Sequence, residues 1–217
     1  MKGDKILVQD HHRAVAGQIA ERLRGRIRGT PARYVIAVAG ESGSGKSETA
    51  RALADALGEA GLPAAILGQD DYFTLPPRSN DARRRQDREW LGPHVEVRMD
   101  VLDANLRDAV AGAPIIVKPL VDYDADTIGE ERLDLGGVRV LIVEGTYTSL
   151  LRHVDTRVFI ARDRSDTLAH RQARHRGQEA ADAFVEQVLV IEHLIIAGHR
   201  QLADFVITRD DQVLAAP

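Results

Sequence analysis

The chain contains no cysteine among its 217 residues. This absence excludes a disulfide framework, a metal site built from thiolates and a catalytic thiol, so any side-chain nucleophile must be an oxygen. Lysine is scarce as well, since among the 29 basic residues only Lys2, Lys5, Lys46 and Lys118 are lysines and the rest are arginines. A single arginine therefore carries little information by itself, whereas a lysine at a special position is informative.

Long apolar runs and an excess of positive charge are also lacking. No run approaches the ~20 apolar residues of a transmembrane helix, and the polar opening Met1-Lys2-Gly3-Asp4-Lys5 is unlike a signal peptide. We therefore expect a cytoplasmic protein with no membrane partner. The formal net charge of -4 argues against a nucleic-acid partner held by a general positive field. The oligomeric state is left open, with a homo-oligomer as one alternative.

One motif dominates what is present. The segment Gly40-Glu41-Ser42-Gly43-Ser44-Gly45-Lys46-Ser47 matches the phosphate-binding pattern G-x-x-x-x-G-K-[ST] without a mismatch. An apolar run at 34–39 precedes it and a segment of helical spacing at 48–57 follows it, which is the strand-loop-helix context that the motif needs. We predict that this loop, together with Thr49, binds ATP through backbone N–H groups. Lys46 is expected at the β and γ phosphates, and the Ser47 hydroxyl is expected to be a Mg2+ ligand.

Apolar strand segments alternate with helical segments along the whole chain. Strands are expected at 34–39, 63–68, 115–117, 138–143, 158–160 and 205–207. Helices are expected at 10–28, 48–57, 99–110 and from about 165 to 202. A polar stretch at 74–97 is expected to be an insertion outside the core. The alternation predicts an α/β fold with a mostly parallel five-stranded sheet and helices on both faces. With the phosphate loop this is the P-loop NTPase type, and the arginine-bearing helices after residue 165 are expected to form a helical lid.

Acidic side chains follow two of the expected strands. Glu144 ends the strand at 138–143, and its carboxylate is a candidate Mg2+ ligand, directly or through water. Asp70 follows the strand at 63–68 and is a candidate general base for an acceptor hydroxyl, with the adjacent Asp71 as the competing choice. Because ligands of parallel sheets bind beyond the carboxyl ends of the strands, we expect these groups at the same edge as the phosphate loop.

Arginines and histidines give weaker signals. A downstream group is a candidate to close over ATP, with a solvated helix face as the alternative: Arg162, Arg164, Arg171, Arg174 and Arg176. The stretch from Arg83 to Arg88 is more simply a solvated helix. The pair His11-His12 is expected at a surface helix start, and His193 is expected to be an ordinary helix residue.

From about Tyr34 to Thr208 the chain resembles the uridine kinase and phosphoribulokinase group of P-loop kinases. The motifs that carry the likeness are the phosphate loop, Gln69-Asp70-Asp71-Tyr72-Phe73, Tyr123-Asp124, Glu144-Gly145, Arg171 with Arg176-Gly177, and Ala203-Asp204-Phe205-Val206-Ile207. We accordingly divide the chain into an N-terminal helical extension at 1–32 and a P-loop kinase domain at 33–217.

The resemblance also implies roles for single residues. It implies that Asp70 is the catalytic base and that Lys46 and the lid residues Arg171 and Arg176 are the other catalytic groups. It implies that Ser47 and Glu144 hold Mg2+. It implies that Tyr123 and Asp124 contact the acceptor. We also expect Asp70, Tyr72 and Arg174 to bind the acceptor.

One departure from the resemblance bears on the substrate. Uridine kinases follow the Y-D pair with a histidine that reads the pyrimidine, whereas this chain has Ile128, which cannot hydrogen-bond a base edge. The leading interpretation is an ATP-dependent kinase that phosphorylates a small hydroxylated acceptor, either a nucleoside or a sugar-like metabolite. One alternative is a phosphoribulokinase-like sugar-phosphate kinase, in which Arg83 to Arg88 hold the substrate's phosphate. Another is a non-catalytic nucleotide-binding switch.

Overall fold

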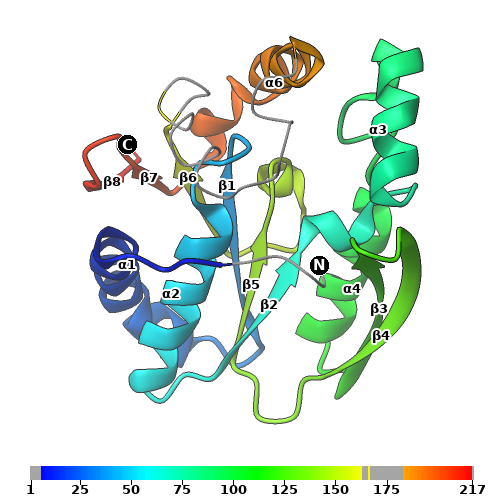
Figure 1. The fold of residues 1–217 in the computed structure, drawn as a ribbon. Helices are drawn as coiled ribbons and strands as arrows, with labels where there is room; N and C mark the ends of the chain where they lie inside the picture. The colour runs from blue at the N-terminus through cyan, green and yellow to red at the C-terminus, as the bar shows by residue number, and fades with distance from the viewer. Residues whose placement is uncertain (1–5, 163–165, 167–182, 217) are drawn as a thin grey trace.

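The structure is a computed structural model that describes residues 6–162, 166 and 183–216. Its helices and strands are labelled in chain order in Figure 1. The helices are α1 (Asp10–Gly29), α2 (Lys46–Glu59), α3 (Pro77–Gln86), α4 (Met99–Val110) and α6 (Ala183–Ile196). The strands are β1 (Tyr34–Gly40), β2 (Ala64–Gly68), β3 (Ile115–Asp122), β4 (Thr127–Asp134), β5 (Val140–Glu144), β6 (Thr156–Ile160), β7 (Phe205–Ile207) and β8 (Val213–Ala215).

Six strands form the central sheet, in the order β2-β5-β1-β6-β7-β8. The first five are mutually parallel, and only β8 pairs antiparallel, with β7. The predicted α/β fold with a mostly parallel sheet is confirmed, with β8 as a strand beyond the five expected. The predicted helical lid falls mainly on residues 163–182, which lie outside the described residues.

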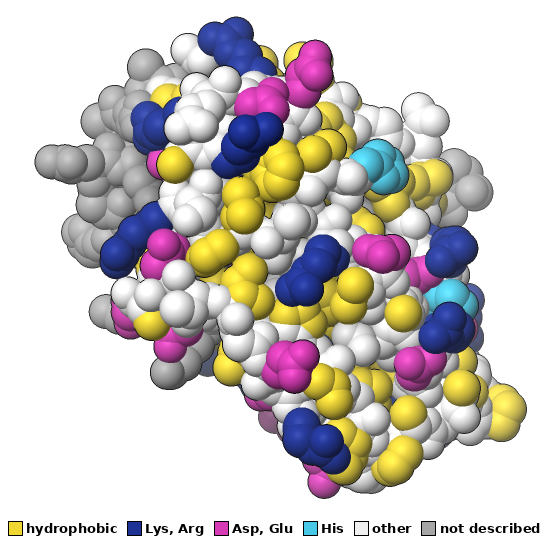
Figure 2. Space-filling model, turned by 90° about the vertical axis from the view of Figure 1, so that its right-hand side faces the viewer, with side chains coloured by type: hydrophobic (Ala, Val, Ile, Leu, Met, Phe, Trp, Pro, Cys, Tyr) yellow, Lys and Arg dark blue, Asp and Glu magenta, His cyan; other side chains and the backbone are white. Residues whose placement is uncertain are grey.

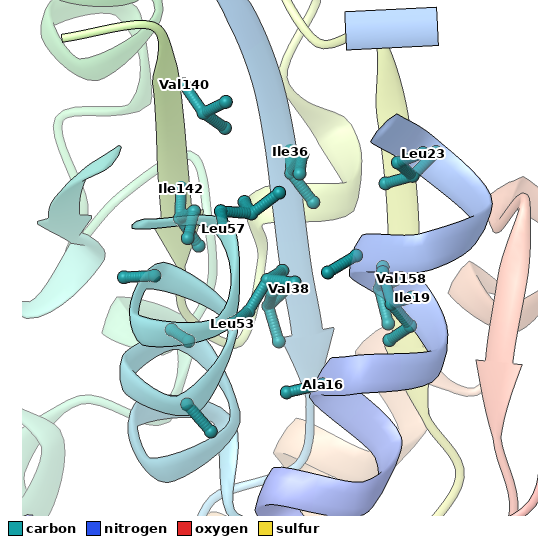
Figure 3. Packing of buried hydrophobic residues seen from close by; sticks show 14 of the residues in the cluster. Ala16, Ile19, Leu23, Ile36, Val38, Leu53, Leu57, Val140, Ile142 and Val158 are labelled. Atoms are coloured by element: carbon teal, nitrogen blue, oxygen red, sulfur yellow. The ribbon is translucent and has the colours of Figure 1, made fainter. Parts of the chain in front are cut away.

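The core has two layers, one on each face of the sheet. Successive residues of β1 alternate between them, since Ile36 and Val38 belong to one cluster while Val35 and Ala37 belong to the other. Helices α1 and α2 cover the first face, where Leu23 and other side chains pack against the strands (Figure 3). Helix α4 covers the second face. A strand buried on both faces must be apolar throughout, which explains the continuous hydrophobic runs of β1 and β5.

Helix α1 belongs to this core. Its buried apolar residues are Val15, Ala16, Ile19, Ala20, Leu23 and Ile27, spaced as expected for one apolar helix face. They pack in the same cluster as those of α2. The division of the chain at residue 32 stays a prediction.

The expected strand at 115–117 lies outside the central sheet, which corrects its placement. It is the start of β3, which pairs antiparallel with β4 in a separate two-stranded sheet beside α4 (Figure 1). The sequence pattern missed β4 because most of its residues are polar and exposed, so it shows no apolar run. The hairpin packs mainly through β3, which contributes buried Ile116 and Val121, while Leu133 of β4 packs against the second core cluster.

The stretch 74–97 was expected to lie outside the core, and its last residues contradict that expectation. Val97 belongs to the second core cluster, and Glu96 is fully buried. The reason is a short antiparallel pairing, in which the Thr74 N–H donates to the Glu96 carbonyl at 2.8 Å and the Arg98 N–H donates to the Tyr72 carbonyl at 2.8 Å. In the part of the chain that the structure describes, no helix is long and apolar enough to cross a membrane.

Candidate active site

The phosphate loop runs from the end of β1 into the first turn of α2, as predicted. Gly43 and Gly45 have φ angles of 79° and 93°, in the left-handed region that favours glycine. Gly45 has a second constraint, because a Cβ atom there would lie 2.9 Å from Nε2 of His12. Helix α2 begins at Lys46, so its N-terminal N–H groups are available to an anion at this loop.

His12 was expected on the surface, and the structure contradicts this. Its side chain is 3% exposed and lies against the phosphate loop at Gly45. The Gln9 N–H donates to His12 Nδ1 at 3.1 Å, which fixes the ring at the start of α1. The sequence offered no signal for this contact, because the two residues meet only through the packing of α1 on α2.

Helix α6 also contacts the phosphate loop. The carboxylate of Glu192 accepts hydrogen bonds from the N–H and the hydroxyl of Ser42, at 2.6 and 2.9 Å. Nδ1 of His193 lies 2.5 Å from Oε1 of Glu41. Glu192 was not predicted from the sequence. The expectation that His193 is an ordinary helix residue is wrong, because its side chain contacts the phosphate loop. Lys46 Nζ donates to the Glu41 carbonyl at 2.9 Å.

Glu144 lies where the sequence predicted an acidic group. In the strand register it is opposite Val38 of β1 and Gly68 of β2, between the strand that leads into the phosphate loop and the strand that leads to Asp70. The pKa of Glu144 is raised to about 7, first by burial and second by the charge of Asp70. The charge of Lys46 and a hydrogen bond with Ser47 lower it.

These residues fit a Mg2+ site of the kind found in kinases. Within residues 6–162, 166 and 183–216 no three His, Asp or Glu side chains form a ready-made metal cage. Mg2+ in kinases usually takes one or two protein oxygens and completes its shell with water and phosphate oxygens. The half-buried Glu144 carboxylate, hydrogen-bonded to the Ser47 side chain, supplies such a pair, and a bound cation would offset the repulsion between Glu144 and Asp70.

The two adjacent aspartates have different environments. Asp71 is 3% exposed, and its carboxylate accepts hydrogen bonds from Lys118 Nζ at 2.7 Å and from the Val121 N–H at 3.1 Å. Both partners belong to β3, so Asp71 attaches the hairpin to the central sheet. Asp70 is only half-buried and faces the region of Glu144 and Lys46.

The Q-D-D segment and the E-G motif are in direct contact. The Tyr147 N–H donates to Oε1 of Gln69 at 2.7 Å. A Cβ atom at Gly145 would lie 2.3 Å from Cβ of Gln69, so only glycine allows this approach. The contact holds the segment that bears Asp70 against the loop that follows Glu144.

The implied acceptor residues are divided between the core and the surface. Tyr72 is fully buried in the second core cluster, and its hydroxyl donates to Oδ1 of Asn105 at 2.9 Å, so it has a packing role in this structure. Tyr123 and Asp124 lie exposed in the turn between β3 and β4. Arg78 of α3 donates to the Asp124 carbonyl at 3.3 Å, which connects the insertion to this turn.

The lid residues Arg171, Arg174 and Arg176 lie outside the described residues, as does Arg164. Arg162 is described, and its guanidinium donates to Asp211 at 2.6 Å beside Gly45. In the insertion, Arg83, Arg84 and Arg85 are each paired with a carboxylate, namely Asp87 at 3.0 Å, Glu96 at 2.6 Å and Asp81 at 2.9 Å.

Comparisons with known proteins agree with this geometry. The model of the family described as "Phosphoribulokinase / Uridine kinase family" matches residues 35–209. A bifunctional alpha-galactosidase/sucrose kinase of Mediterraneibacter gnavus is 28% identical over an alignment of 210 residues, which covers 91% of this chain but only 22% of that protein. A uridine kinase of Bacillus cytotoxicus is 28% identical over 198 residues, covering 85% of this chain and 89% of that enzyme.

The fold agrees with a solved structure as well. The D-glycerate 3-kinase of Cryptococcus neoformans superposes with a TM-score of 0.63 and 14% identity, over 94% of this chain and 99% of that one. At this level of identity the likeness concerns the fold alone.

Proposed function

This chain belongs to the phosphoribulokinase/uridine kinase family, and we propose that it transfers the γ-phosphoryl group of ATP to a hydroxyl of a small, uncharged, polyhydroxylated acceptor. The observation that carries the proposal is the position of Glu144 between β1 and β2. This register brings the phosphate loop, a candidate metal ligand and Asp70 to one edge of the sheet. Phosphoryl transfer requires those three functions within reach of each other.

The residues of the site have separable roles in this reaction. Lys46 would leave the Glu41 carbonyl and contact the β and γ phosphates. Ser47 and Glu144 would hold Mg2+, which when bound offsets negative charge on the phosphate oxygens. Asp70 would accept the proton of the acceptor hydroxyl as its oxygen bonds to the γ-phosphorus and the bond to the ADP oxygen breaks. Asp71 is the weaker choice of base because Lys118 and Val121 already engage both of its oxygens.

Several observations support an uncharged, sugar-like acceptor. Arg83, Arg84 and Arg85 are already paired with carboxylates, so they offer little net charge to a substrate phosphate. Figure 2, which views the side of α3 and the hairpin, shows basic and acidic side chains interspersed on this face. Ile128 in β4 provides no hydrogen bond to a pyrimidine, and the sucrose kinase relative is consistent with a sugar-like acceptor.

The test is ADP release from MgATP across nucleosides, sugars, sugar phosphates and polyols. We expect an uncharged sugar or polyol to give the highest kcat/KM, with Asp70→Asn as the inactive control. Uridine turnover with kcat/KM of about 10⁴ M⁻¹s⁻¹ or above, in the ordinary enzyme range, would show that Ile128 does not exclude pyrimidines. A best substrate that carries a phosphate would favour the sugar-phosphate kinase, and MgATP binding without turnover of any acceptor would favour the nucleotide-binding switch.

A further inference from the structure

Two neighbouring residues of α6 hold two neighbouring residues of the phosphate loop. Oε1 of Glu192 accepts the Ser42 N–H at 2.6 Å, and Oε2 accepts the Ser42 hydroxyl at 2.9 Å. His193 Nδ1 lies 2.5 Å from Oε1 of Glu41. The partners are separated by about 150 residues of sequence, so tertiary packing alone produces these contacts.

Two donors of the phosphate loop, the Ser42 N–H and Lys46 Nζ, are thus engaged within the protein. Backbone N–H groups and the lysine are the donors that bind phosphate oxygens in such loops. Here the N–H of Ser42 donates to an anionic oxygen of Glu192, and Lys46 Nζ donates to the Glu41 carbonyl. A protein carboxylate therefore occupies a donor of the loop as a phosphate oxygen would.

The charge of Glu192 opposes a second anion at the loop. Its side chain is 6% exposed, so water screens it poorly. Burial raises the pKa of Glu192, while the charge of Lys46 and the two hydrogen bonds from Ser42 lower it. A triphosphate that recruits Lys46 removes one of these stabilising charges and adds negative charge beside the carboxylate.

The position of helix α6 allows a local displacement around Glu192. It lies at one end of the molecule, next to the strand ends that lead into the loop (Figure 1). Leu194 is 72% exposed and Val190 is 39% exposed, whereas Leu189 and Ile196 of the same helix are 5% and 1% exposed. Release of Glu192 from Ser42 therefore requires a local shift of the helix around Glu192, because separation of the whole helix would expose Leu189 and Ile196.

We propose that Glu192 is a resting-state ligand of the phosphate loop that competes with the triphosphate, so that nucleotide binding releases Glu192 and its part of α6 from Ser42. The inference rests on the proposed ATP-dependent function. It assigns Glu192 a positioning role, since the residue acts on the nucleotide through the conformation of the loop.

The test is the Kd of MgATP, measured by titration calorimetry for wild type and Glu192→Gln. Glutamine keeps an acceptor for the Ser42 N–H but removes the charge. We expect Kd to fall about tenfold, the scale of one unit charge acting on another across roughly 10 Å at an effective dielectric of ~20. Glu186→Gln removes one charge from the same helix, six residues before Glu192, and is expected to leave Kd within about twofold. An unchanged or higher Kd for Glu192→Gln would overturn the inference.

A second measurement uses the wild-type protein and does not depend on a variant folding. Hydrogen exchange of the amides around Glu192 should increase on addition of MgATP if α6 is released. Unchanged or slower exchange there, with MgATP bound, would contradict the competition. Failure of wild type to bind MgATP at all would instead refute the proposed function, so the two failures are distinguishable.

Discussion

The adjacent carboxylates of Asp70 and Asp71 should respond in opposite ways to the same substitution. Asp71→Asn removes the charge of a carboxylate that is almost fully buried and accepts a hydrogen bond from Lys118 Nζ at 2.7 Å. Lys118 is itself 4% exposed, so the substitution leaves its ammonium without the buried counterion. We therefore expect Asp71→Asn to lower the free energy of unfolding and not to reduce kcat directly.

The magnitude follows from what remains around Lys118. Removal of one partner of a buried ion pair typically costs about 3–5 kcal/mol. Lys118 retains Glu131 at 2.9 Å and the Pro119 carbonyl at 3.1 Å, and the Glu131 side chain is 41% exposed. This partial compensation places the expected loss near the lower end, at about 3 kcal/mol. In urea such a loss lowers the unfolding midpoint by about 1 M or more.

Asp70→Asn is the matched control at the neighbouring position. Asp70 is half-buried, and its charge raises the pKa of Glu144, so removal of that charge relieves a repulsion. We expect the urea midpoint to stay unchanged or rise slightly. In contrast, kcat at saturating MgATP and acceptor should fall by on the order of a hundredfold, the scale of general-base removal.

Urea unfolding and steady-state kinetics of both variants test which aspartate acts in catalysis and which stabilises the fold. Full stability of Asp71→Asn would show that the Lys118 pair contributes little to the fold. A large loss of kcat in a stable Asp71→Asn protein, with Asp70→Asn still active, would transfer the role of base to Asp71.

Three further outcomes are expected. Lys46→Ala should lose on the order of 10² or more in kcat, because the lysine offsets phosphate charge, while its circular dichroism and unfolding midpoint match wild type. Ser47→Ala and Glu144→Gln should each raise the Mg2+ concentration for half-maximal activity by on the order of tenfold, measured by metal titration at fixed ATP. Asp103→Asn should destabilise the fold at neutral pH. Burial by itself raises the pKa of Asp103, but hydrogen bonds from residues 152 and 153 hold that pKa below its usual range. Its stabilisation is therefore present above the unfolded pKa of ~3.9 and lost as pH falls through the folded value, so the two unfolding curves should converge in acid.

A specific experimental result would refute each of these three predictions. Wild-type activity in a folded Lys46→Ala protein would refute the phosphate-loop assignment. An unchanged Mg2+ requirement in both metal-site variants would refute the pairing of Ser47 with Glu144. A stability difference for Asp103→Asn that persists unchanged at acid pH would show that the lost contacts do not depend on the carboxylate charge.

The sequence by itself determined those features that depend on neighbours along the chain. The phosphate loop needs glycines at fixed offsets, and helix α4 at 99–110 follows from apolar spacing over a few turns. The edge of the sheet that carries Glu144 and Asp70 was also predictable, because parallel strands bring their carboxyl ends together. In each case the prediction follows from the local pattern together with a general rule of helix or sheet geometry.

The tertiary structure decided the features that depend on distant partners. Asp70 and Asp71 are equivalent in sequence, and only the packing of β3 places Lys118 against Asp71. Strand β4 is polar and forms because β3 supplies its hydrogen-bonding partner. Glu192 reaches Ser42 across 150 residues. No local pattern encodes such a contact, because its free energy arises only after the chain has folded and excluded water from the paired groups.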